Sequence, residues 1–197
     1  MSDGARKARE ADVSRAIQQT HSELGAITFA ANCAGVDPIS DLIDYTEAQF
    51  NAIFGVNVKG LFFCTKHQIL AMKDKGGVTV NVSSAAARTP FAGCSLYNAS
   101  KSAAAMLTRS AAVEAGKHGI RVIEVAPGPI DTPMLKRYFE QERAKGSQVT
   151  EKTVEGATLL GRIGRPEDVA KAILFLCSSE ASFVTAATLN VDGGFPG

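Results

Sequence analysis

Tryptophan is absent from this chain of 197 residues, and histidine and cysteine are scarce. The three histidines and four cysteines form no CxxC pair and no zinc-like spacing, which argues against a structural zinc site. The cysteines (Cys33, Cys64, Cys94 and Cys177) lie far apart in the chain. We therefore expect buried, reduced thiols in a cytoplasmic protein rather than disulfides or a metal site.

The chain also lacks an excess of charge of either sign. Its 21 basic and 20 acidic residues give a net charge of +1, so no field gathers nucleic acid or an anionic membrane. No apolar run is long enough for a membrane span, and the polar N-terminus has no signal-peptide core. With 45% hydrophobic residues and no repeat or linker, residues 1–197 are expected to form a single domain.

Hydrophobic patterns predict strands that alternate with helices. Short apolar runs without helical period predict strands over 26–32, 78–83, 120–126 and 187–191. Helical periods and end signals predict four helices before or between these strands. The first has the apolar residues Val13, Ile17 and Leu24 and stops at Gly25, and the second begins with the capping box Thr46–Gln49. The third covers 95–112 and ends near Gly119, and the fourth has Pro166 as its first residue. The polar segment 136–156 is expected to be a mobile loop.

Strands that alternate with long helices imply right-handed crossovers and a mostly parallel sheet. In such sheets the ligand crevice lies at the carboxyl ends of the strands. The segments that follow the predicted strands are "NCAG", "SSAA", "PGPIDTP" and "DGG". A site is therefore expected where these segments meet.

Tyr97 and Lys101 stand four residues apart at the start of the alanine-rich helix, so their side chains share one face. An ammonium close to a phenol favours the phenolate and lowers the tyrosine pKa from about 10, which makes the phenol a proton donor and acceptor. The alternative is a helix tyrosine that merely packs along a lysine stem. Ser84 ends a predicted strand, and its hydroxyl is expected in the same crevice.

Asn57 lies in the middle of an apolar helix, in "FGVNVKG" between Gly55 and Gly60. Asparagine is a poor residue for a helix interior because its amide competes for backbone hydrogen bonds. One interpretation is a polar residue tolerated on a solvated edge. The other is a local kink that holds a water molecule against Lys101.

These motifs occur in an order that resembles the short-chain dehydrogenases/reductases. The resemblance runs from about Val13 to Gly194 and rests on "NCAG", "GVNVKG", "NVSS", "YNASK", "PGPIDTP", "GRPEDVA" and "LNVDGGF". It implies an α/β fold of Rossmann-like, doubly wound type with a mostly parallel sheet. It also implies an oxidoreductase that interconverts a secondary alcohol and a ketone with NAD or NADP.

The resemblance implies a role for each catalytic side chain. Tyr97 is expected to act as general acid and base on the substrate oxygen, and Lys101 to lower its pKa and bind the nicotinamide ribose. Ser84 is expected to hydrogen-bond the substrate oxygen, and Asn57 to anchor the water of a proton relay. Ser83 is interpreted as structural.

The resemblance also implies which residues line the cofactor, and none of them is a metal ligand. They comprise the two catalytic residues Tyr97 and Lys101, the segment Asn32, Ala34 and Gly35, and the turn Pro127, Gly128, Ile130 and Thr132. The alternative for the turn is a connection made rigid by proline. Two departures are small: Cys33 replaces an asparagine, and Ala186 replaces a glycine, which is expected to disturb the last turn before the final strand.

The large departure is at the front, where the family has a strand, the loop TGxxxGxG and two further strands. The chain is therefore expected to be an N-terminally truncated domain without its pyrophosphate-binding loop, and the choice between NAD and NADP is unreadable. Strand 26–32 then becomes an open edge that invites pairing. Three hypotheses follow: an incomplete version of an active dehydrogenase, a cofactor-free remnant that acts by association, or an enzyme that binds cofactor weakly or through a partner chain.

Two expectations concern partners. The helices that bear Asn57 and Tyr97 are expected to form a homo-oligomer, because the family uses them as a dimer face. The segment 134–154 is expected to cover an apolar alcohol or ketone through Met134, Leu135, Tyr138 and Phe139, although the same pattern fits an ordinary amphipathic helix.

Overall fold

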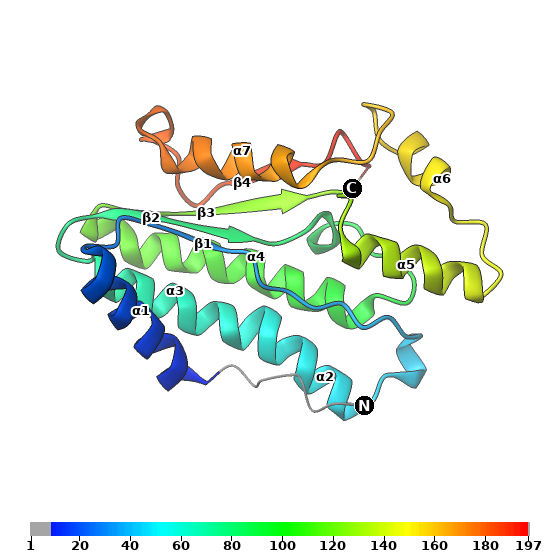
Figure 1. Ribbon diagram of the computed structural model, residues 1–197, viewed down its shortest axis with the longest axis horizontal. Helices are drawn as coiled ribbons and strands as arrows, with labels where there is room; N and C mark the ends of the chain where they lie inside the picture. Colours follow the sequence, from blue (N-terminus) through cyan, green and yellow to red (C-terminus); the bar gives the residue numbers. More distant parts are fainter. Residues whose placement is uncertain (1–8, 197) are drawn as a thin grey trace.

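A computed structural model describes residues 9–196 (Figure 1). Its centre is one parallel sheet with the spatial order β1-β2-β3-β4. The strands are β1 (Phe29–Asn32), β2 (Gly77–Val82), β3 (Ile120–Pro127) and β4 (Thr188–Val191). The predicted α/β class and parallel sheet are confirmed, although β1 begins three residues later than the run 26–32.

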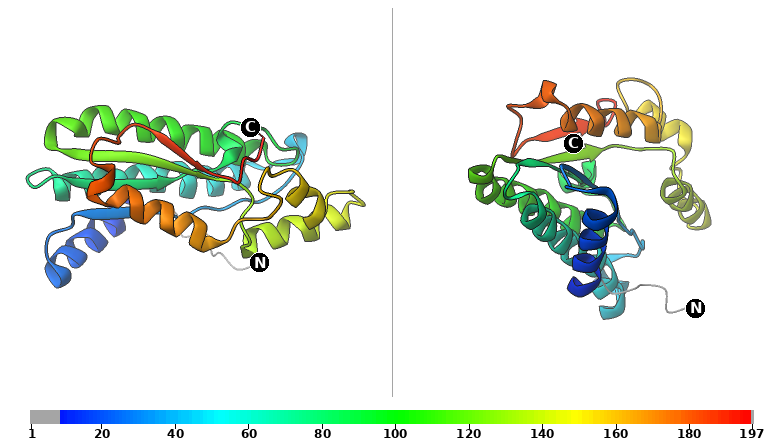
Figure 2. Two further views of the ribbon diagram at one scale, coloured as in Figure 1. Left: turned by 90° about the horizontal axis from the view of Figure 1, so that it is seen from above. Right: turned by 60° about the vertical axis from the view of Figure 1, so that its left-hand side comes forward.

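Helices cover both faces of this sheet (Figures 1 and 2). On one face, α3 (Leu61–Met72) and α4 (Ser95–Ala115) pack on β1, β2 and β3. On the other, α7 (Pro166–Cys177) packs on β2, β3 and β4. Successive residues of β3 enter opposite cores, Ile123 with Leu176 of α7 and Val122 with Ala112 of α4. Apolar side chains therefore cover both faces of the central strands, as parallel sheets require.

The helix predicted to begin at Thr46 is confirmed, with an interruption. Thr46 and Gln49 form the capping box of α2 (Glu47–Phe54), and a π-helical segment, Gly55–Gly60, joins it to α3. Asn57 lies inside this segment and is 2% exposed. Such π segments occur often at functional sites because they redirect side chains within a helix.

The first helix, α1 (Glu10–Leu24), packs beside α3 and not on the sheet (Figure 1). Its attachment is polar: the Glu10 carboxylate lies 2.6 Å from Lys66 Nζ and 3.2 Å from His67 Nε2. None of its residues is fully buried. The predicted stop at Gly25 is confirmed, with a φ of 85° that disfavours other residues.

The segment 136–156 is not a loop, so that prediction is wrong. It contains most of α5 (Pro133–Ala144) and all of α6 (Glu151–Gly156). The Thr132 hydroxyl caps α5 by accepting from Leu135 N, and Thr150 caps α6 in the same way. Phe139 is the buried residue of α5, at 7% exposure. The alternative given for 134–154, an amphipathic helix, is the one that α5 supports.

β1 is an edge strand of the described sheet, and its far side carries no further strand among residues 9–196. Phe29 of this strand is 58% exposed. The open edge is confirmed, whereas the interpretation of 26–32 as a buried strand is wrong. Within the described range, no helix has the length and apolarity needed to cross a membrane.

Candidate active site

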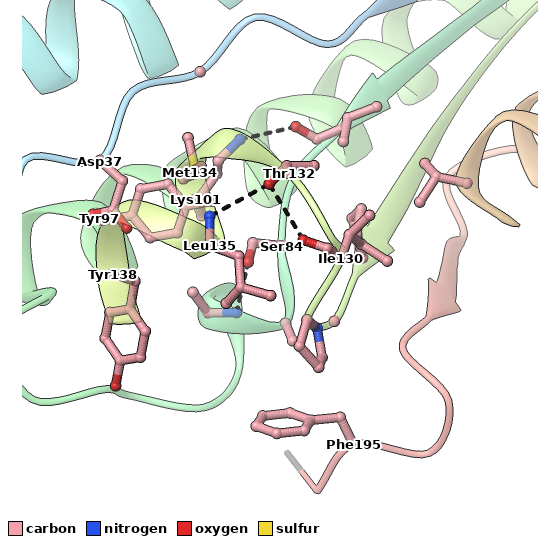
Figure 3. Close-up of a pocket in the computed structure, with 18 of the residues that line it drawn as sticks. Asp37, Ser84, Tyr97, Lys101, Ile130, Thr132, Met134, Leu135, Tyr138 and Phe195 are labelled. Atoms are coloured by element: carbon pink, nitrogen blue, oxygen red, sulfur yellow. Dashed lines mark hydrogen bonds between the residues drawn. The ribbon is translucent and has the colours of Figure 1, made fainter. Parts of the chain in front are cut away.

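A cavity of about 850 Å³ opens at the carboxyl ends of the strands, where the sequence predicts a site. Its walls come from the segments after β1, β2 and β3, from the start of α4, and from α5, α6 and α7. Figure 3 shows the polar side chains Asp37, Ser84, Tyr97 and Lys101 on one wall and residues of α5 nearby. Most of the remaining lining is apolar.

Tyr97 and Lys101 occupy the first two turns of α4 and lie together, as their spacing predicts. Lys101 Nζ is 5.6 Å from the centroid of the Tyr97 ring. The ammonium donates a hydrogen bond to the carbonyl oxygen of Val82, 3.0 Å away at the end of β2. Lys101 is 5% exposed, so most of its stem is covered and its head is held at the cavity wall.

Burial shifts the pKa values of both groups. It raises the pKa of Tyr97 to about 12, although a hydrogen bond with Ser84 acts in the opposite direction. It also lowers the pKa of Lys101 to about 8, although Asp37 opposes this shift. The predicted lowering of the Tyr97 pKa is therefore wrong for this structure, because loss of hydration outweighs the hydrogen bond with Ser84. A phenol with this pKa is protonated at neutral pH and is a proton donor.

Ser84 follows β2 directly, with an extended backbone at a φ of −173°. Its Oγ accepts a hydrogen bond from Ala86 N at 3.1 Å, so its hydroxyl proton remains for donation to the Tyr97 phenol or to a ligand oxygen. Ser83 points the other way and donates to the buried carboxylate of Glu124 on β3. This contact agrees with the structural role predicted for Ser83.

Asn57 is not on a solvated edge, so that alternative is wrong. Its Oδ1 accepts from Val36 N, and its Nδ2 donates to Val36 O and to Ser100 Oγ, each over 2.9 Å. The amide thus fastens the segment after β1 to α4. Both of its donors are used, and only Oδ1 retains capacity to bind a water molecule.

Gly35 explains why this segment approaches Lys101 so closely. A Cβ at this position would lie 3.3 Å from Lys101 Nζ and 3.6 Å from Asn57 Oδ1. Gly35 lines the cavity, whereas Asn32 and Ala34 lie outside the described lining. The Asn32 amide is instead bonded to Gln68 and to Asn81, so its side chain ties β1 to α3 and β2. The structure thus gives Asn32 a bracing role.

The turn after β3 lines the cavity with Pro127, Gly128, Ile130 and Thr132. It is partly structural, because a Cβ on Gly128 would lie 2.7 Å from that of Asp192. The Thr132 hydroxyl also has local partners, since it donates to Ile130 O at 3.3 Å and accepts from Leu135 N at 3.4 Å. Both hydrogen bonds are long, so the hydroxyl is available to a ligand at modest cost.

These residues fit the nicotinamide end of a dinucleotide. The Lys101 ammonium has three donors and uses one on Val82, which leaves two for ribose hydroxyls. Gly35 and Gly128 permit close approach of the backbone, and the walls are largely apolar. Residues 9–196 contain no glycine-rich turn after a strand that would take the pyrophosphate. In the same range, no three His, Cys, Asp or Glu side chains converge as metal ligands.

Sequence reasoning missed Asp37, which lines the cavity two residues after Gly35. Its Oδ1 is buried and has no hydrogen-bond partner among the described residues. Burial raises the pKa of the carboxyl group to about 6, although Lys101 and Arg137 act in the opposite direction. The available signal was an acidic residue two positions after "NCAG", in the segment that follows a predicted strand.

Comparison with known proteins decides the family. A family model described as enoyl-(acyl carrier protein) reductase matches residues 8–196. A short-chain dehydrogenase/reductase of Armillaria gallica is 38% identical over 188 residues, which are 94% of this chain and 72% of that protein. This chain belongs to the short-chain dehydrogenase/reductase family. The family is one of NAD(P)-dependent oxidoreductases that act on small molecules, as the fit of the cavity indicates.

One further relative and one solved structure are also similar to this chain. A cis-4-hydroxycyclohexanecarboxylate dehydrogenase of Sinomonas cyclohexanicum is 37% identical, over 94% of this chain and 72% of the relative. The solved structure titled "ElxO with NADP Bound" superposes with a TM-score of 0.85 at 30% identity, over 95% of this chain and 75% of that chain. The Rossmann-like fold predicted from the motifs is thereby confirmed.

Proposed function

We propose that this short-chain dehydrogenase/reductase interconverts a secondary alcohol and a ketone with NAD or NADP. The observation that supports this most directly is the meeting of Ser84, Tyr97 and Lys101 on the wall of one largely apolar cavity. When bound, the nicotinamide cofactor supplies or accepts the hydride. The protein's own residues handle the proton and the charge on the substrate oxygen.

In the direction of reduction, the Tyr97 hydroxyl donates its proton to the carbonyl oxygen of the substrate. The Ser84 hydroxyl donates a hydrogen bond to the same oxygen, in place of its hydrogen bond with Tyr97, and stabilises the charge that develops there. Lys101, held by Val82 O, stabilises the phenolate that remains on Tyr97. Asn57 acts through position, because its amide fixes the segment that carries Gly35 against Lys101.

We further propose that Gly35, Lys101 and the turn after β3 hold the nicotinamide end of the cofactor. In that turn Pro127, Gly128 and Ile130 would supply contacts, and Thr132 a hydroxyl. Asn32 is assigned no cofactor contact, because its amide is used inside the fold.

The substrate we propose is an alcohol or ketone on a carbon ring. The lining from α5 supports this, because Met134, Leu135 and Tyr138 present largely apolar surface. One relative is named for a hydroxycyclohexane substrate, which is a ring of the size that such a wall accommodates. Phe139, predicted to cover the substrate, is instead packed inside the fold at 7% exposure and is outside the described lining.

The first experiment is calorimetric titration of NADH and NADPH into the purified chain, followed by absorbance assays with cyclohexanone and cyclohexanol. We expect Tyr97→Phe to lower kcat by about 100-fold to 10,000-fold while cofactor affinity stays within about threefold. Ser84→Ala, which removes one hydrogen bond to the reacting oxygen, is expected to lower kcat by about 100-fold. Asp44→Asn, on an exposed residue, is the control. Full activity of Tyr97→Phe would refute the assignment.

A second candidate function, association without catalysis, is supported by the exposed edge of β1 and by exposed apolar residues on α4. Met106 and Val113 of that helix are 57% and 79% exposed. A well-folded oligomer that binds neither NADH nor NADPH would favour this candidate over the dehydrogenase.

We also propose that the protein is located in the cytoplasm, where the four free cysteines would stay reduced.

A further inference from the structure

Asp37 has no assigned part in the proton transfer described above, yet it lies in the same cavity. It is the only carboxylate in the described lining. No side-chain hydrogen bond or ion pair within the range 9–196 involves it, and its Oδ1 is buried. A buried carboxylate oxygen without a donor has lost hydration without a compensating hydrogen bond, so a donor on a ligand would be favourable there.

The segment that carries Asp37 is held on both sides. Val36 is fixed through its N–H and its C=O by the amide of Asn57, over 2.9 Å in each case. On the other side, the Tyr45 hydroxyl donates to the carbonyl oxygen of Pro38 at 2.9 Å. The backbone that carries Asp37 is therefore held in place before any ligand binds, which favours a specific polar contact.

The surroundings favour an uncharged donor. Lys101 and Arg137 are both close enough to act electrostatically on Asp37. They already supply positive charge, so a ligand ammonium would meet repulsion from two cations as well as attraction to one carboxylate. A hydroxyl group donates a hydrogen bond to the carboxylate without adding charge.

The position of Asp37 also bears on which hydroxyl it binds. Its charge acts on Tyr97, so it is near the group that handles the reacting oxygen. The reacting oxygen itself needs donors, which are Tyr97 and Ser84, and an ionised carboxylate would repel its developing charge. A different hydroxyl of the same substrate meets this requirement, since it can reach Asp37 while the reacting oxygen stays at Tyr97 and Ser84.

We propose that Asp37 accepts a hydrogen bond from a second hydroxyl of the substrate, so that the preferred substrates are ring diols or hydroxyketones rather than simple alcohols. This inference rests on the proposed dehydrogenase function for the identity of the reacting group. It names a specificity residue, because Asp37 contacts the substrate away from the bond that reacts. A site built around such an acceptor discriminates strongly against an analogue that lacks the hydroxyl.

The test compares cyclohexanol with the 1,2-, 1,3- and 1,4-cyclohexanediols. Affinity is measured by ligand-observed NMR with and without NADPH, and kcat/KM is measured with NADP⁺ and NAD⁺. We expect the best diol to exceed cyclohexanol by about tenfold or more in the unaltered protein, since a hydrogen bond to a charged group contributes about 1.5–3 kcal/mol. Asp37→Leu, which has the same branching without the charge, should bring the ratio of kcat/KM between the best diol and cyclohexanol to about one. Asp37→Asn should keep part of the diol preference, and Asp44→Asn all of it.

The outcomes separate this inference from the proposed function. A diol preference in binding that Asp37→Leu removes, without turnover of any alcohol, would support the role of Asp37 and contradict the dehydrogenase. Turnover without a diol preference, or an equal loss on both substrate types in Asp37→Leu, would overturn the inference alone. Tighter binding of 4-aminocyclohexanol than of any diol would mean that Asp37 binds an amine, which would overturn the proposal that it binds a hydroxyl. Failure of all four alcohols to bind would also overturn it.

Discussion

Asp37 makes the fold less stable when it is ionised, because its folded-state pKa of about 6 lies above the ordinary 3.8. As the pH rises through this window, the unfolded chain releases the proton first, so stability is lost between about pH 4 and 6 and remains lower above it. Allowing for the exposed part of the side chain, the penalty is about 1–2 kcal/mol. We expect Asp37→Asn to be more stable than the unaltered protein by this amount at about pH 8, and nearly equal at about pH 4.

Urea unfolding at both pH values measures this difference. Asp44→Asn, which changes an exposed carboxylate of the same type, is the control. A loss of stability in Asp37→Asn at the higher pH would mean that the carboxylate has a structural partner, which contradicts the unpaired state described above. A gain would identify Asp37 as a residue retained at the expense of stability, as functional residues often are.

Gly35 offers a second prediction on single residues. A methyl group in Gly35→Ala would lie 3.3 Å from Lys101 Nζ, so the flexible end of the lysine must move away. We expect about a tenfold or greater loss of kcat, because catalytic groups tolerate little displacement, with a stability change below about 1 kcal/mol. Gly55→Ala is the matched control, since a Cβ there meets no atom within 4 Å. An unchanged kcat in Gly35→Ala would show that the Lys101 ammonium can move away from residue 35 without loss of activity.

The residue scale also shows where sequence reasoning stops. Tyr97 and Lys101 were found because helical geometry fixes which residues share a face. The direction of the Tyr97 pKa shift was wrong, because burial depends on segments far away in the sequence. Asn32 was assigned to the cofactor, but its amide is used by Gln68 and Asn81, which only tertiary packing brings near.

At the scale of single elements, end signals were the most reliable predictors. Thr46, Pro166, Gly25 and Gly119 all mark ends as predicted, because capping and left-handed glycines act over three or four residues. The helical character of the segment with α5 and α6 was predicted only as an alternative, since few apolar residues mark the buried side of these helices. The start of β1 was misplaced, because a neighbouring strand decides where pairing begins.

The turn before β4 contains a strained residue that the sequence did indicate. Ala186 has a φ of 55°, and it is the only non-glycine residue in the described range with a positive φ. The left-handed conformation is unfavourable for alanine by about 1–2 kcal/mol, part of which glycine would lose again in chain entropy. We expect Ala186→Gly to raise the free energy of unfolding by about 0.5–1 kcal/mol without changing cofactor affinity. Urea unfolding tests this, and destabilisation would show that the Ala186 methyl group, which packs against the α4 core, outweighs the strain.

On the scale of the whole molecule, two apolar surfaces are open to a second copy of the chain. One is the outer side of α4, where Met106 and Val113 are seven residues apart and therefore on one face. The other is the edge of β1, with Phe29. α1 packs beside α3 and covers one flank of that helix (Figure 1), whereas the outer side of α4 has no such cover among residues 9–196.

We therefore expect association through α4, and the double variant Met106→Glu with Val113→Glu to reduce the mass in solution to that of a single chain. Two carboxylates placed opposite their own copies across a two-fold axis repel each other as well as losing apolar contact. Light scattering coupled to size exclusion measures the mass, and Leu174→Glu, on a residue of α7 that is 72% exposed, is the control. An oligomer that survives the α4 variant but dissociates with Phe29→Lys would assign the contact to the open edge instead, because a lysine there opposes strand pairing. The α4 variant also tests a link with catalysis, because Tyr97 and Lys101 are on the same helix. If the variant becomes a single chain and also loses activity, the contact between copies holds this helix in its active position.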